Sequence, residues 1–401
     1  MNLIKKTPLH ISEFLSNKYN CRVFLKREDL QKVRSFKIRG AYNKIMNNLT
    51  NNNSNIYVSA SAGNHAQGVA YVCNQVKKEH YIFLPQSTPK QKIERIKYFG
   101  GEYLNLNIVD DNLSNVLKQS ERFAKHNNYN FIHPFDDMDI IMGQGKILPE
   151  IIEEINPDFI LVPVGGGGLL SGILEYKNKL NLDTKIIGVE PINSASLHYS
   201  LKNNKITKID NNDDFVDGAS VKTVGNINYE ICTKFNLKYD NVKLIDNNHL
   251  CNSIVELYQN EGIISEPAGC LSISALDKLD PIKIRNKNIV CILSGGNNDI
   301  MRYSTFIEKS LIYAGLKHYF LIEFNQVPGE LKDFVNKITS DKVDITRFEY
   351  LKKNNINIGN VLIGLELSNK NQIFDLLLNM NKSSIKYTKI DPDDKLYKLL
   401  I

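Results

Sequence analysis

One lysine lies in a setting that suits amine chemistry. Lys37 belongs to the stretch Arg34–Ala41, which follows an extended run at Arg22–Lys26 and opens a segment with apolar residues at helical spacing. Ser35 is predicted to cap that helix, which puts Lys37 in its first turn. The amides of a first turn oppose a cation and favour the neutral amine, which is the form that attacks carbonyl compounds. Taken alone, Lys37 is also typical of an ordinary surface lysine.

A loop of small residues follows the predicted strand Ile56–Val58. The loop Ser59–Gly68 leads into a helical segment. Small side chains let a ligand approach the backbone, and the amides at a helix start bind anions such as a carboxylate. Asn64 adds a side-chain amide donor. The loop is also typical of a plain strand-to-helix turn capped by Asn64, and we interpret His65 as a structural neighbour rather than a base.

A run of four glycines follows another predicted strand. Gly165–Gly168 stands between the apolar run Phe159–Val164 and an apolar helix that begins at Leu169. A flexible linker is a poor explanation for glycines wedged between a buried strand and a buried helix. Bare backbone amides at a helix start form a phosphate-binding cradle, which is what this spacing favours.

Two other phosphate motifs can be tested against the same glycines. The pattern G-x-x-x-x-G-K-[ST] is absent, and G-x-G-x-x-G fails because Leu170 or Ser171 replaces the third glycine. Glu190, at the end of the next predicted strand, does stand where the ribose-binding acid of a dinucleotide site is expected. A nicotinamide-dependent oxidoreductase therefore stays open as an alternative.

These residues need a scaffold that brings strand ends together. From about residue 22 to residue 300, apolar strand-like runs alternate with amphipathic helical segments. This alternation predicts an α/β fold with mostly parallel, helix-covered sheets. Ligands of such sheets gather at the carboxyl ends of the strands. A further strand end, Ser294–Asn298 after Ile289–Leu293, supplies a hydroxyl and two glycines, although it is also typical of an ordinary turn.

Composition excludes several classes of function. The chain has 401 residues, 42% of them apolar, and a net charge of +6 with no basic block, so a nucleic-acid partner is not expected. No apolar run is long enough to span a membrane, and no signal peptide is recognised. The six cysteines form no C-x-x-C pair and several lie in apolar runs, which predicts buried free thiols and a cytoplasmic location. No metal site is expected.

Four stretches together resemble a known enzyme family. They are Ser35–Ala41, Ser59–Gly68, Gly165–Leu169 and Ser294–Asn297. Their order and contexts resemble the pyridoxal-phosphate β-family, and within it the threonine and serine dehydratases, over about residues 5–315. The resemblance implies a two-lobed α/β catalytic domain of fold type II, the tryptophan-synthase-β-like fold, which we place at residues 1–317.

The resemblance also implies roles for individual residues. Lys37 is expected to carry pyridoxal 5'-phosphate as an imine and to remove the substrate's Cα proton. Asn64 is expected to bond the ring's 3-oxygen, and Ser294 to face the pyridine nitrogen. The substrate carboxylate is expected against the loop made of Ser61, Ala62, Gly63 and Asn64. The phosphate is expected against the cradle of Gly165, Gly166, Gly167, Gly168 and Leu169.

Three positions refine this expectation. A serine partner cannot protonate the pyridine nitrogen, so Ser294 favours prompt loss of the β-hydroxyl over a long-lived carbanion. Racemase relatives carry a serine where this chain has Ala62, so a racemase is disfavoured. They also place several acids near Glu190 to bind a divalent cation, and a further acid is missing here. Glu266 fits the family, and we expect it only to pack behind the site.

The last part of the chain has a different character. From His318, the apolar pattern predicts the order βαββαβ, with strands at Tyr319–Phe324, Asp344–Tyr350, Val361–Leu367 and Ile385–Ile390 and a loop at Lys352–Asn360. This order resembles an ACT-like regulatory domain, which we place at residues 318–401. The resemblance implies isoleucine as a candidate effector. A dimerisation module without a ligand is the alternative.

The expectation is a threonine dehydratase that makes 2-oxobutanoate and ammonia for isoleucine biosynthesis. An L-serine dehydratase is the near alternative, because one methyl group is worth only about 1–3 kcal/mol of discrimination. A non-enzymatic amino-acid sensor is a further alternative. The expected partners are a small amino-acid substrate and further copies of the chain, as a dimer or tetramer.

Overall fold

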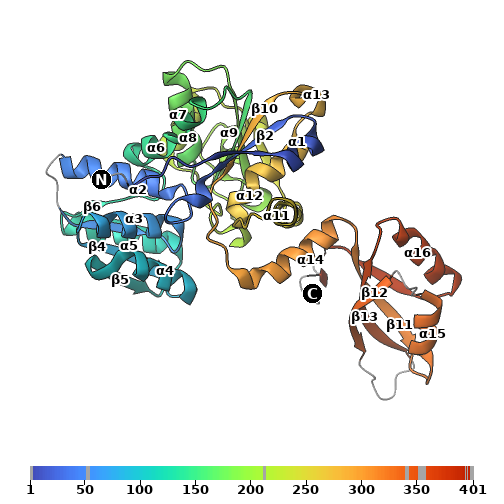
Figure 1. The fold of residues 1–401 in the computed structure, drawn as a ribbon. Helices are drawn as coiled ribbons and strands as arrows, with labels where there is room; N and C mark the ends of the chain where they lie inside the picture. The colour runs from blue at the N-terminus through green and yellow to red at the C-terminus, as the bar shows by residue number, and fades with distance from the viewer. Residues whose placement is uncertain are drawn as a thin grey trace. The chain divides into compact units, whose positions relative to one another are not determined.

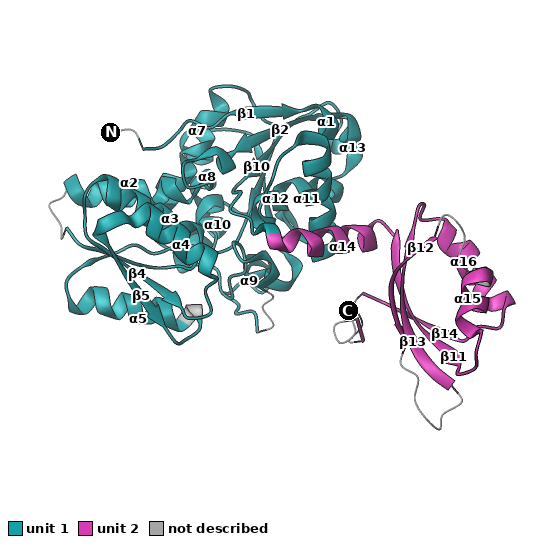
Figure 2. Cartoon of the chain, turned by 60° about the horizontal axis from the view of Figure 1, so that its bottom comes forward, with its two compact units in different colours: residues 1–300 teal, residues 301–401 magenta. Residues whose placement is uncertain are grey.

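The computed structural model describes residues 3–50, 55–210, 214–338, 343–350, 358–392, 394 and 396–397. The chain divides into two compact units, residues 1–300 and 301–401 (Figures 1 and 2). The predicted domain boundary at 317/318 falls later in the sequence than the division between residues 300 and 301. Each unit is described here by itself.

The larger sheet of the first unit has six strands in the order β1-β2-β10-β7-β8-β9. Strand β1 runs antiparallel to β2, and the other neighbouring strands run parallel. The apolar strands are buried on both faces, as expected of parallel strands covered by helices. The strands are β1 (Leu9–Ser12), β2 (Arg22–Arg27), β10 (Asn288–Leu293), β7 (Phe159–Pro163), β8 (Lys185–Pro191) and β9 (Val242–Ile245).

The smaller sheet of the first unit has four parallel strands in the order β5-β4-β3-β6. Its strands form one lobe, and β2 and β10 belong to the other lobe (Figure 1). Separate apolar clusters underlie the two sheets, one around Ile160 and Val290 and one around Tyr57 and Ile82. The strands are β3 (Tyr57–Ala60), β4 (His80–Pro85), β5 (Leu104–Val109) and β6 (Asn130–Phe131).

Helices cover these sheets and connect the strands. Helices α8 and α12 pack against β7, and α3 and α5 pack against β3. The α-helices of the first unit are α1 (Glu13–Tyr19), α2 (Lys37–Thr50), α3 (Asn64–Gln75), α4 (Lys90–Gly100), α5 (Leu113–His126), α6 (Met138–Gly145), α7 (Ile147–Ile152), α8 (Gly168–Lys179), α9 (Ser196–Lys202), α10 (Asn226–Lys234), α11 (Asn247–Glu261), α12 (Pro267–Ser274) and α13 (Pro281–Ile284).

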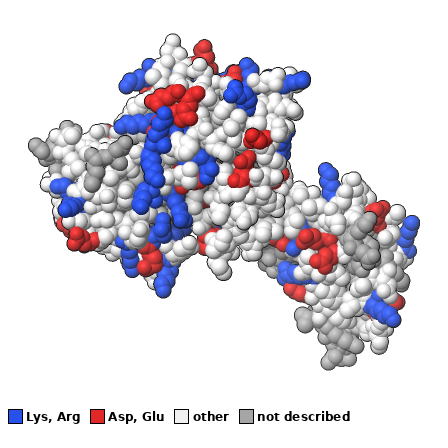
Figure 3. All heavy atoms as spheres, viewed as in Figure 1, with Lys and Arg blue, Asp and Glu red and all other residues white. Residues whose placement is uncertain are grey.

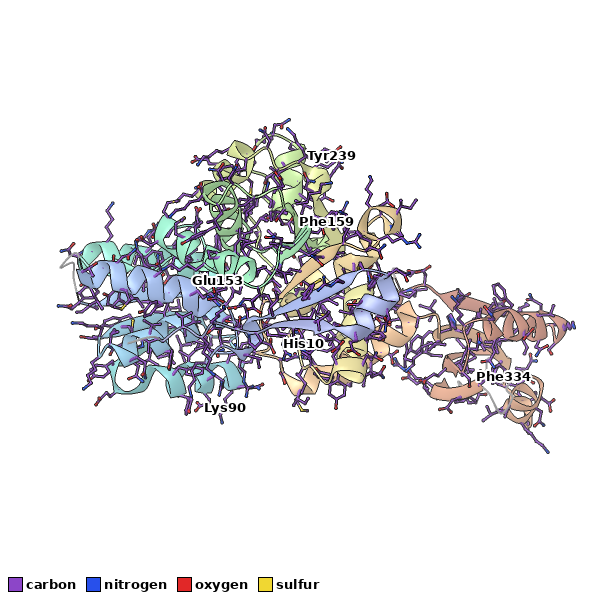
Figure 4. All side chains as sticks on the ribbon, turned by 45° about the horizontal axis from the view of Figure 1, so that its top comes forward. His10, Lys90, Glu153, Phe159, Tyr239 and Phe334 are labelled. Atoms are coloured by element: carbon purple, nitrogen blue, oxygen red, sulfur yellow. The ribbon has the colours of Figure 1, made fainter. Side chains whose placement is uncertain are left out.

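The second unit is an antiparallel sheet with two helices on it. After α14 (Tyr303–Tyr313), its strands take the order β12-β13-β11-β14. Phe334 on α15 (labelled in Figure 4) lies 5.2 Å, ring to ring, from Phe324 in the core of this unit. The elements are β11 (Lys317–Asn325), α15 (Glu330–Ile338), β12 (Val343–Tyr350), β13 (Ile358–Leu367), α16 (Gln372–Lys382) and β14 (Tyr387–Ile390).

The predicted fold class is confirmed. Both sheets of the first unit are mostly parallel, and the second unit has the predicted βαββαβ order. The predicted helix starts at Asn64 and near Leu169 lie within one residue of α3 and α8. Most of the predicted loop Lys352–Asn360 lies outside the described residues. The short strands β1, β6 and β9 were not predicted.

One local prediction is wrong. Ser35 does not cap helix α2, which begins at Lys37, and the Ser35 hydroxyl has no hydrogen-bond partner among the described residues. Ser35 instead forms an isolated antiparallel bridge with Gly295, which holds its backbone against the loop after β10. The backbone pairing explains why this serine is buried without acting as a cap.

Two further observations bear on the excluded classes. In the parts of the chain that the structure describes, no helix is long and apolar enough to cross a membrane. Across the same described ranges, no group of three or more His, Cys, Asp or Glu side chains could hold a metal ion. The six cysteines are buried and free of disulfides, as predicted.

Candidate active site

Lys37 is the first residue of helix α2. Its Nζ donates a hydrogen bond to the carbonyl oxygen of Pro134 at 2.9 Å and lies 5.4 Å from the centre of the Phe36 ring. Burial lowers the pKa of the Lys37 amine to about 8, against an opposing pull from the Glu266 carboxylate. Desolvation disfavours the charged form, so this lysine gives up its proton more readily than an exposed lysine does.

The loop after β10 holds the segment before Lys37. The amide of Phe36 donates to the carbonyl of Ser294 at 3.1 Å, and the amide of Gly296 donates to the carbonyl of Arg34 at 2.9 Å. Arg34 has a positive φ of 56°, which a residue with a side chain adopts only under local constraint. The structure therefore brings the predicted residues Lys37 and Ser294 together through backbone pairing.

Ser294 itself is buried. Its hydroxyl donates to the carbonyl of Ala268 at 3.2 Å, at the start of helix α12. The hydroxyl oxygen still has a lone pair for a further donor and can rotate to donate elsewhere. Ser294 lies at the end of a strand, beside the Lys37 segment.

A buried ion-pair network anchors the other side of the Lys37 helix. The Arg39 guanidinium makes paired hydrogen bonds to both Glu28 and Glu150, with nitrogen–oxygen distances of 2.6–2.8 Å. Lys26 Nζ also lies 2.7 Å from Glu150. Arg39, Glu28 and Lys26 are almost completely buried. Sequence reasoning assigned Arg39 no role, although its place two residues after Lys37 was a usable signal.

The four glycines form a turn between β7 and α8. Gly167 has a φ of 98°, a conformation that favours glycine. Among the described residues, no acceptor takes a hydrogen bond from the amides of Gly165 to Leu169. The Asn228 side chain fixes the turn by donating a hydrogen bond to the carbonyl oxygen of Gly166 at 2.9 Å. Free amides at a helix start match an anion such as a phosphate.

The segment from His133 to Phe135 links the glycines to Lys37, and sequence reasoning missed it. Pro134 accepts the bond from Lys37, and a Cβ added to Gly166 would lie 2.2 Å from the Phe135 ring. Burial lowers the pKa of His133 to about 4, and its Nδ1 accepts hydrogen bonds from the next amides. The predicted lysine and the predicted phosphate cradle are therefore neighbours.

Asn64 lies at the start of α3 and is fixed by two side chains. Its Nδ2 donates to Glu266 Oε1 at 2.7 Å, and its Oδ1 accepts from Asn297 Nδ2 at 2.7 Å. The Asn297 nitrogen also donates to the carbonyl of Val33 at 2.8 Å. This chain joins the smaller lobe to the loop after β10 and to the Lys37 segment.

The loop before α3 is partly exposed, as a substrate-binding surface must be. Ser61, Ala62 and Gly63 are all partly accessible, and the Gly63 amide donates to Ser61 Oγ at 3.2 Å. A Cβ added to Gly68, one helical turn further on, would lie 3.2 Å from the amide nitrogen of Ile38. The small residue thus lets helix α3 lie directly against the start of helix α2.

His65 is held away from proton chemistry. Its Nε2 lies 3.2 Å from the Ile132 carbonyl, and burial lowers the pKa of the ring to about 3. Burial disfavours the charged form and outweighs the bond to Ile132, which favours it, so the imidazole stays neutral near pH 7. This agrees with the interpretation of His65 as a structural neighbour.

Glu190 is not open to a ribose. Its carboxylate is fully buried and accepts hydrogen bonds from the amides of Leu197 and His198 at 2.9 and 2.8 Å, at the start of helix α9. Burial raises its pKa to about 8. These contacts give the acid a helix-capping role and remove the observation that kept a nicotinamide cofactor open.

Two protein-family models match this chain. The family described as "Pyridoxal-phosphate dependent enzyme" matches residues 1–295, and "C-terminal regulatory domain of Threonine dehydratase" matches residues 308–400. The chain belongs to the pyridoxal-phosphate dependent enzyme family. Its members depend on pyridoxal phosphate. The surroundings of Lys37 and the four glycines are the candidate site for that cofactor.

Two bacterial relatives match the chain over its whole length. "L-threonine dehydratase biosynthetic IlvA" of Halalkalibacterium halodurans is 42% identical over 402 residues, covering 100% of this chain and 96% of that protein. The protein of the same name from Bacillus subtilis is also 42% identical and covers 100% of this chain and 94% of its own length. The resemblance to the dehydratases of this family is thus shown over the full chain.

Solved structures of the family share the fold. A processed form of threonine deaminase isoform 2 from Solanum lycopersicum has a TM-score of 0.72 and 34% identity, covering 77% of this chain and 89% of that one. Serine racemase from Dictyostelium discoideum has a TM-score of 0.67 and 29% identity, covering 74% of this chain and 94% of that one. These matches support the fold type II architecture.

The residues present fit the family's cofactor. The glycine turn offers free amides to a phosphate, and Lys37 offers an amine whose pKa is lowered to about 8. A stripe of Lys and Arg side chains runs down the face of the first unit in Figure 3. The donor set and the small residues agree with one phosphate-bearing aldehyde.

Proposed function

We propose that this protein is a threonine dehydratase that converts L-threonine to 2-oxobutanoate and ammonia. The observation that carries the proposal is the Lys37 amine, which has a lowered pKa and lies beside the Pro134–Phe135 segment that also borders the glycine turn. The full-length likeness to proteins named biosynthetic L-threonine dehydratase supports the choice of substrate.

The cofactor would be held by residues from both lobes. We assign Lys37 to its aldehyde carbon, Asn64 to its ring oxygen and Ser294 to its ring nitrogen. The phosphate is assigned to the amides of Gly165, Gly166, Gly167, Gly168 and Leu169. When bound, pyridoxal phosphate supplies an electron sink for the bonds at the substrate Cα.

The chain's own residues then bind the substrate and move its proton. Ser61, Ala62, Gly63 and Asn64 face the substrate carboxylate, with the α3 amides favouring negative charge. The neutral Lys37 amine takes the proton from the substrate Cα, a task that its lowered pKa suits near neutral pH. The β-hydroxyl leaves as water, and hydrolysis of the released imine consumes one water and gives the 2-oxo acid and ammonia.

An assay of 2-oxo acid release tests this function. Purified protein with pyridoxal phosphate is expected to release 2-oxobutanoate from L-threonine, and the Lys37→Ala variant is expected to release none. L-Serine is the comparison substrate, since the near alternative is an L-serine dehydratase. If the protein binds no pyridoxal phosphate and neither amino acid is consumed, the proposal fails.

The second unit is proposed to regulate the first. We propose a catalytic domain over residues 1–317 and an ACT-like regulatory domain over residues 318–401, with isoleucine as its effector. The match of residues 308–400 to the regulatory domain of threonine dehydratase supports this assignment. We also propose a cytoplasmic homo-oligomer, a dimer or tetramer. Adding isoleucine to the threonine assay is expected to lower the rate, and light scattering measures the oligomer.

A further inference from the structure

Glu266 is a buried carboxylic acid at the candidate site that the proposed reaction does not yet use. It lies just before helix α12 and is only 6% exposed. Its amide donates to the carbonyl of Gly295 at 3.3 Å. A Cβ added to Gly295 would lie 1.9 Å from Glu266 Oε1, so only glycine lets the carboxylate lie over this loop.

The loop under Glu266 is the one that pairs with the Lys37 segment. Gly295 bridges Ser35, two residues before Lys37. The carboxylate therefore lies against the same backbone pairing that fixes the start of helix α2. The Glu266 carboxylate interacts electrostatically with the buried Lys37 amine, and buried surroundings weaken such an interaction less than bulk water does.

Glu266 also determines which way the Asn64 amide points. An ionised carboxylate only accepts hydrogen bonds, so the Asn64 nitrogen must face Glu266 and its oxygen must face the donating nitrogen of Asn297. The amide nitrogen has two hydrogens, and Glu266 takes one of them. The second N–H remains to be directed at the ring oxygen that we assign to Asn64.

We propose that Glu266 is a positioning residue, whose carboxylate orients the Asn64 amide and sets the charge state of the Lys37 amine. This inference rests on the proposed function of Lys37 and Asn64. It gives the acid two separable effects: a directional effect through its hydrogen bond and an electrostatic effect through its charge.

The charged groups around both residues agree with the electrostatic effect. Burial and Asp217 raise the pKa of Glu266 to about 7, while Asn64, Lys92 and Lys37 oppose the rise. Glu266 is therefore mostly ionised at the pH where Lys37, with a pKa of about 8, loses its proton. The two histidines near the amine, His65 and His133, have pKa values lowered to about 3 and 4 and are neutral there.

The electrostatic effect is tested on protein without its cofactor. The rate at which an anhydride acylates Lys37 is measured against pH, with peptide mass spectrometry to follow that lysine alone. Glu266→Gln removes the charge and keeps an oxygen for Asn64. We expect the midpoint for Lys37 to fall by about 0.5–1 pH units, since loss of a nearby negative charge favours the neutral amine. An unchanged midpoint overturns the electrostatic effect.

Asp277→Asn is the control for loss of a carboxylate charge elsewhere in the unit. Asp277 is a more exposed carboxylate of the same unit that accepts from Tyr19 at 2.7 Å and contacts His249 at 2.8 Å, outside the network around Lys37. This variant is expected to leave the Lys37 midpoint where it is in the wild type. A shift as large as that of Glu266→Gln would show a general effect of lost charge and would overturn the specific role.

The directional effect is tested by comparing Glu266→Gln with Glu266→Leu. Only the glutamine offers Asn64 an acceptor, so the leucine variant is expected to bind pyridoxal phosphate at least about tenfold more weakly, a loss typical of one oriented hydrogen bond. Equal cofactor affinity in the two variants overturns this effect. If Glu266→Leu does not fold, Glu266→Asp, which withdraws the acceptor from Asn64, replaces it with the same expected direction.

These measurements separate this inference from the proposed function. Acylation and cofactor binding require no substrate. A protein that shows the Lys37 shift but leaves threonine unchanged would retain the role of Glu266 and refute the dehydratase activity. A protein that consumes threonine but shows no shift of the Lys37 midpoint, and equal cofactor affinity in the two variants, would retain the dehydratase activity and refute the role of Glu266.

Discussion

Lys37 Nζ and the carbonyl oxygen of Pro134 lie 2.9 Å apart and join the start of helix α2 to the segment that borders the glycine turn. The bond orients the amine, and its surroundings lower the pKa of that amine. Phe135, the next residue, lies against Gly166. The two halves of the candidate cofactor site, an amine and a phosphate cradle, are thus held in one arrangement by two consecutive residues, Pro134 and Phe135.

Gly166→Ala is expected to disable the phosphate cradle. The added Cβ would lie 2.2 Å from the Phe135 ring, so either the ring or the turn must move. We expect affinity for pyridoxal phosphate to fall by at least about 100-fold, which corresponds to about 2.7 kcal/mol. Equilibrium titration of the cofactor absorbance measures this loss.

Gly262→Ala serves as the control for the glycine turn. Gly262 has a φ of 64° and nothing within 4 Å of an added Cβ, so the substitution strains the backbone at a helix end without touching the site. It is expected to lower stability by about 1 kcal/mol and leave cofactor affinity unchanged. If it weakened cofactor binding as strongly as Gly166→Ala, the cradle would not be the cause.

Arg39→Met is expected to destabilise the first unit strongly. The substitution leaves the buried carboxylate of Glu28 and the partly buried carboxylate of Glu150 without the guanidinium that pairs with both. Removing one partner of a buried ion pair typically costs about 3–5 kcal/mol. Urea unfolding, followed by circular dichroism, measures the change in the free energy of unfolding.

An exposed ion pair provides the comparison for Arg39. Lys97 and Glu94 are paired at 3.3 Å with both side chains more than half exposed. Lys97→Met is expected to change stability by no more than about 0.5 kcal/mol, because exposed pairs contribute little. A loss for Arg39→Met as small as this would contradict the anchoring role of the buried network.

Glu190 is expected to make stability fall as pH rises. Burial raises its pKa to about 8 in the folded chain, from the ordinary value of 4.5 for an exposed carboxylic acid. Between these values the folded state binds more protons than the unfolded state, so stability decreases with rising pH. Its share of the loss between pH 5 and 8 is at most about 4 kcal/mol.

Glu190→Gln isolates that contribution. The variant differs from the wild type by a constant offset and by the loss of one titrating group, so the comparison uses the slope of stability against pH. We expect a flatter slope in the variant between pH 5 and 8. Parallel slopes for the two proteins would mean that Glu190 titrates normally in the folded chain.

Phe334→Ala tests whether the second unit has the proposed regulatory role. Phe334 is 3% exposed and packs in the core of that unit, so truncation is expected to cost about 3–5 kcal/mol there. Inhibition by isoleucine is expected to weaken while the uninhibited rate with threonine remains. The control is Phe374→Ala, at a residue that is 71% exposed. Full inhibition despite an unfolded second unit would contradict the regulatory assignment.

Sequence reasoning could recognise motifs that directly follow apolar strands. The glycine run, the small-residue loop and Ser294 each follow an apolar strand, and parallel strands end at one edge of a sheet. It could not find contacts that depend on tertiary packing. Pro134 offers only a backbone carbonyl to Lys37, and nothing in its side chain indicates that bond.

The prediction that Ser35 caps helix α2 fails for a related reason. A serine before a helix is usually a cap, but Ser35 is drawn into a backbone bridge with Gly295, 260 positions away in the chain. Glu266 was expected only to pack behind the site, because an isolated acid gives no indication of its partners. Its bond to Asn64 and its place over Gly295 exist only in the folded chain.

The central claim is that Lys37 carries pyridoxal phosphate. Borohydride reduction of the protein with its cofactor, followed by peptide mass spectrometry, tests it most directly. We predict one reduced pyridoxyl group per chain, located on Lys37. Reduction that leaves Lys37 unmodified, or that places the group on another lysine, would contradict the account.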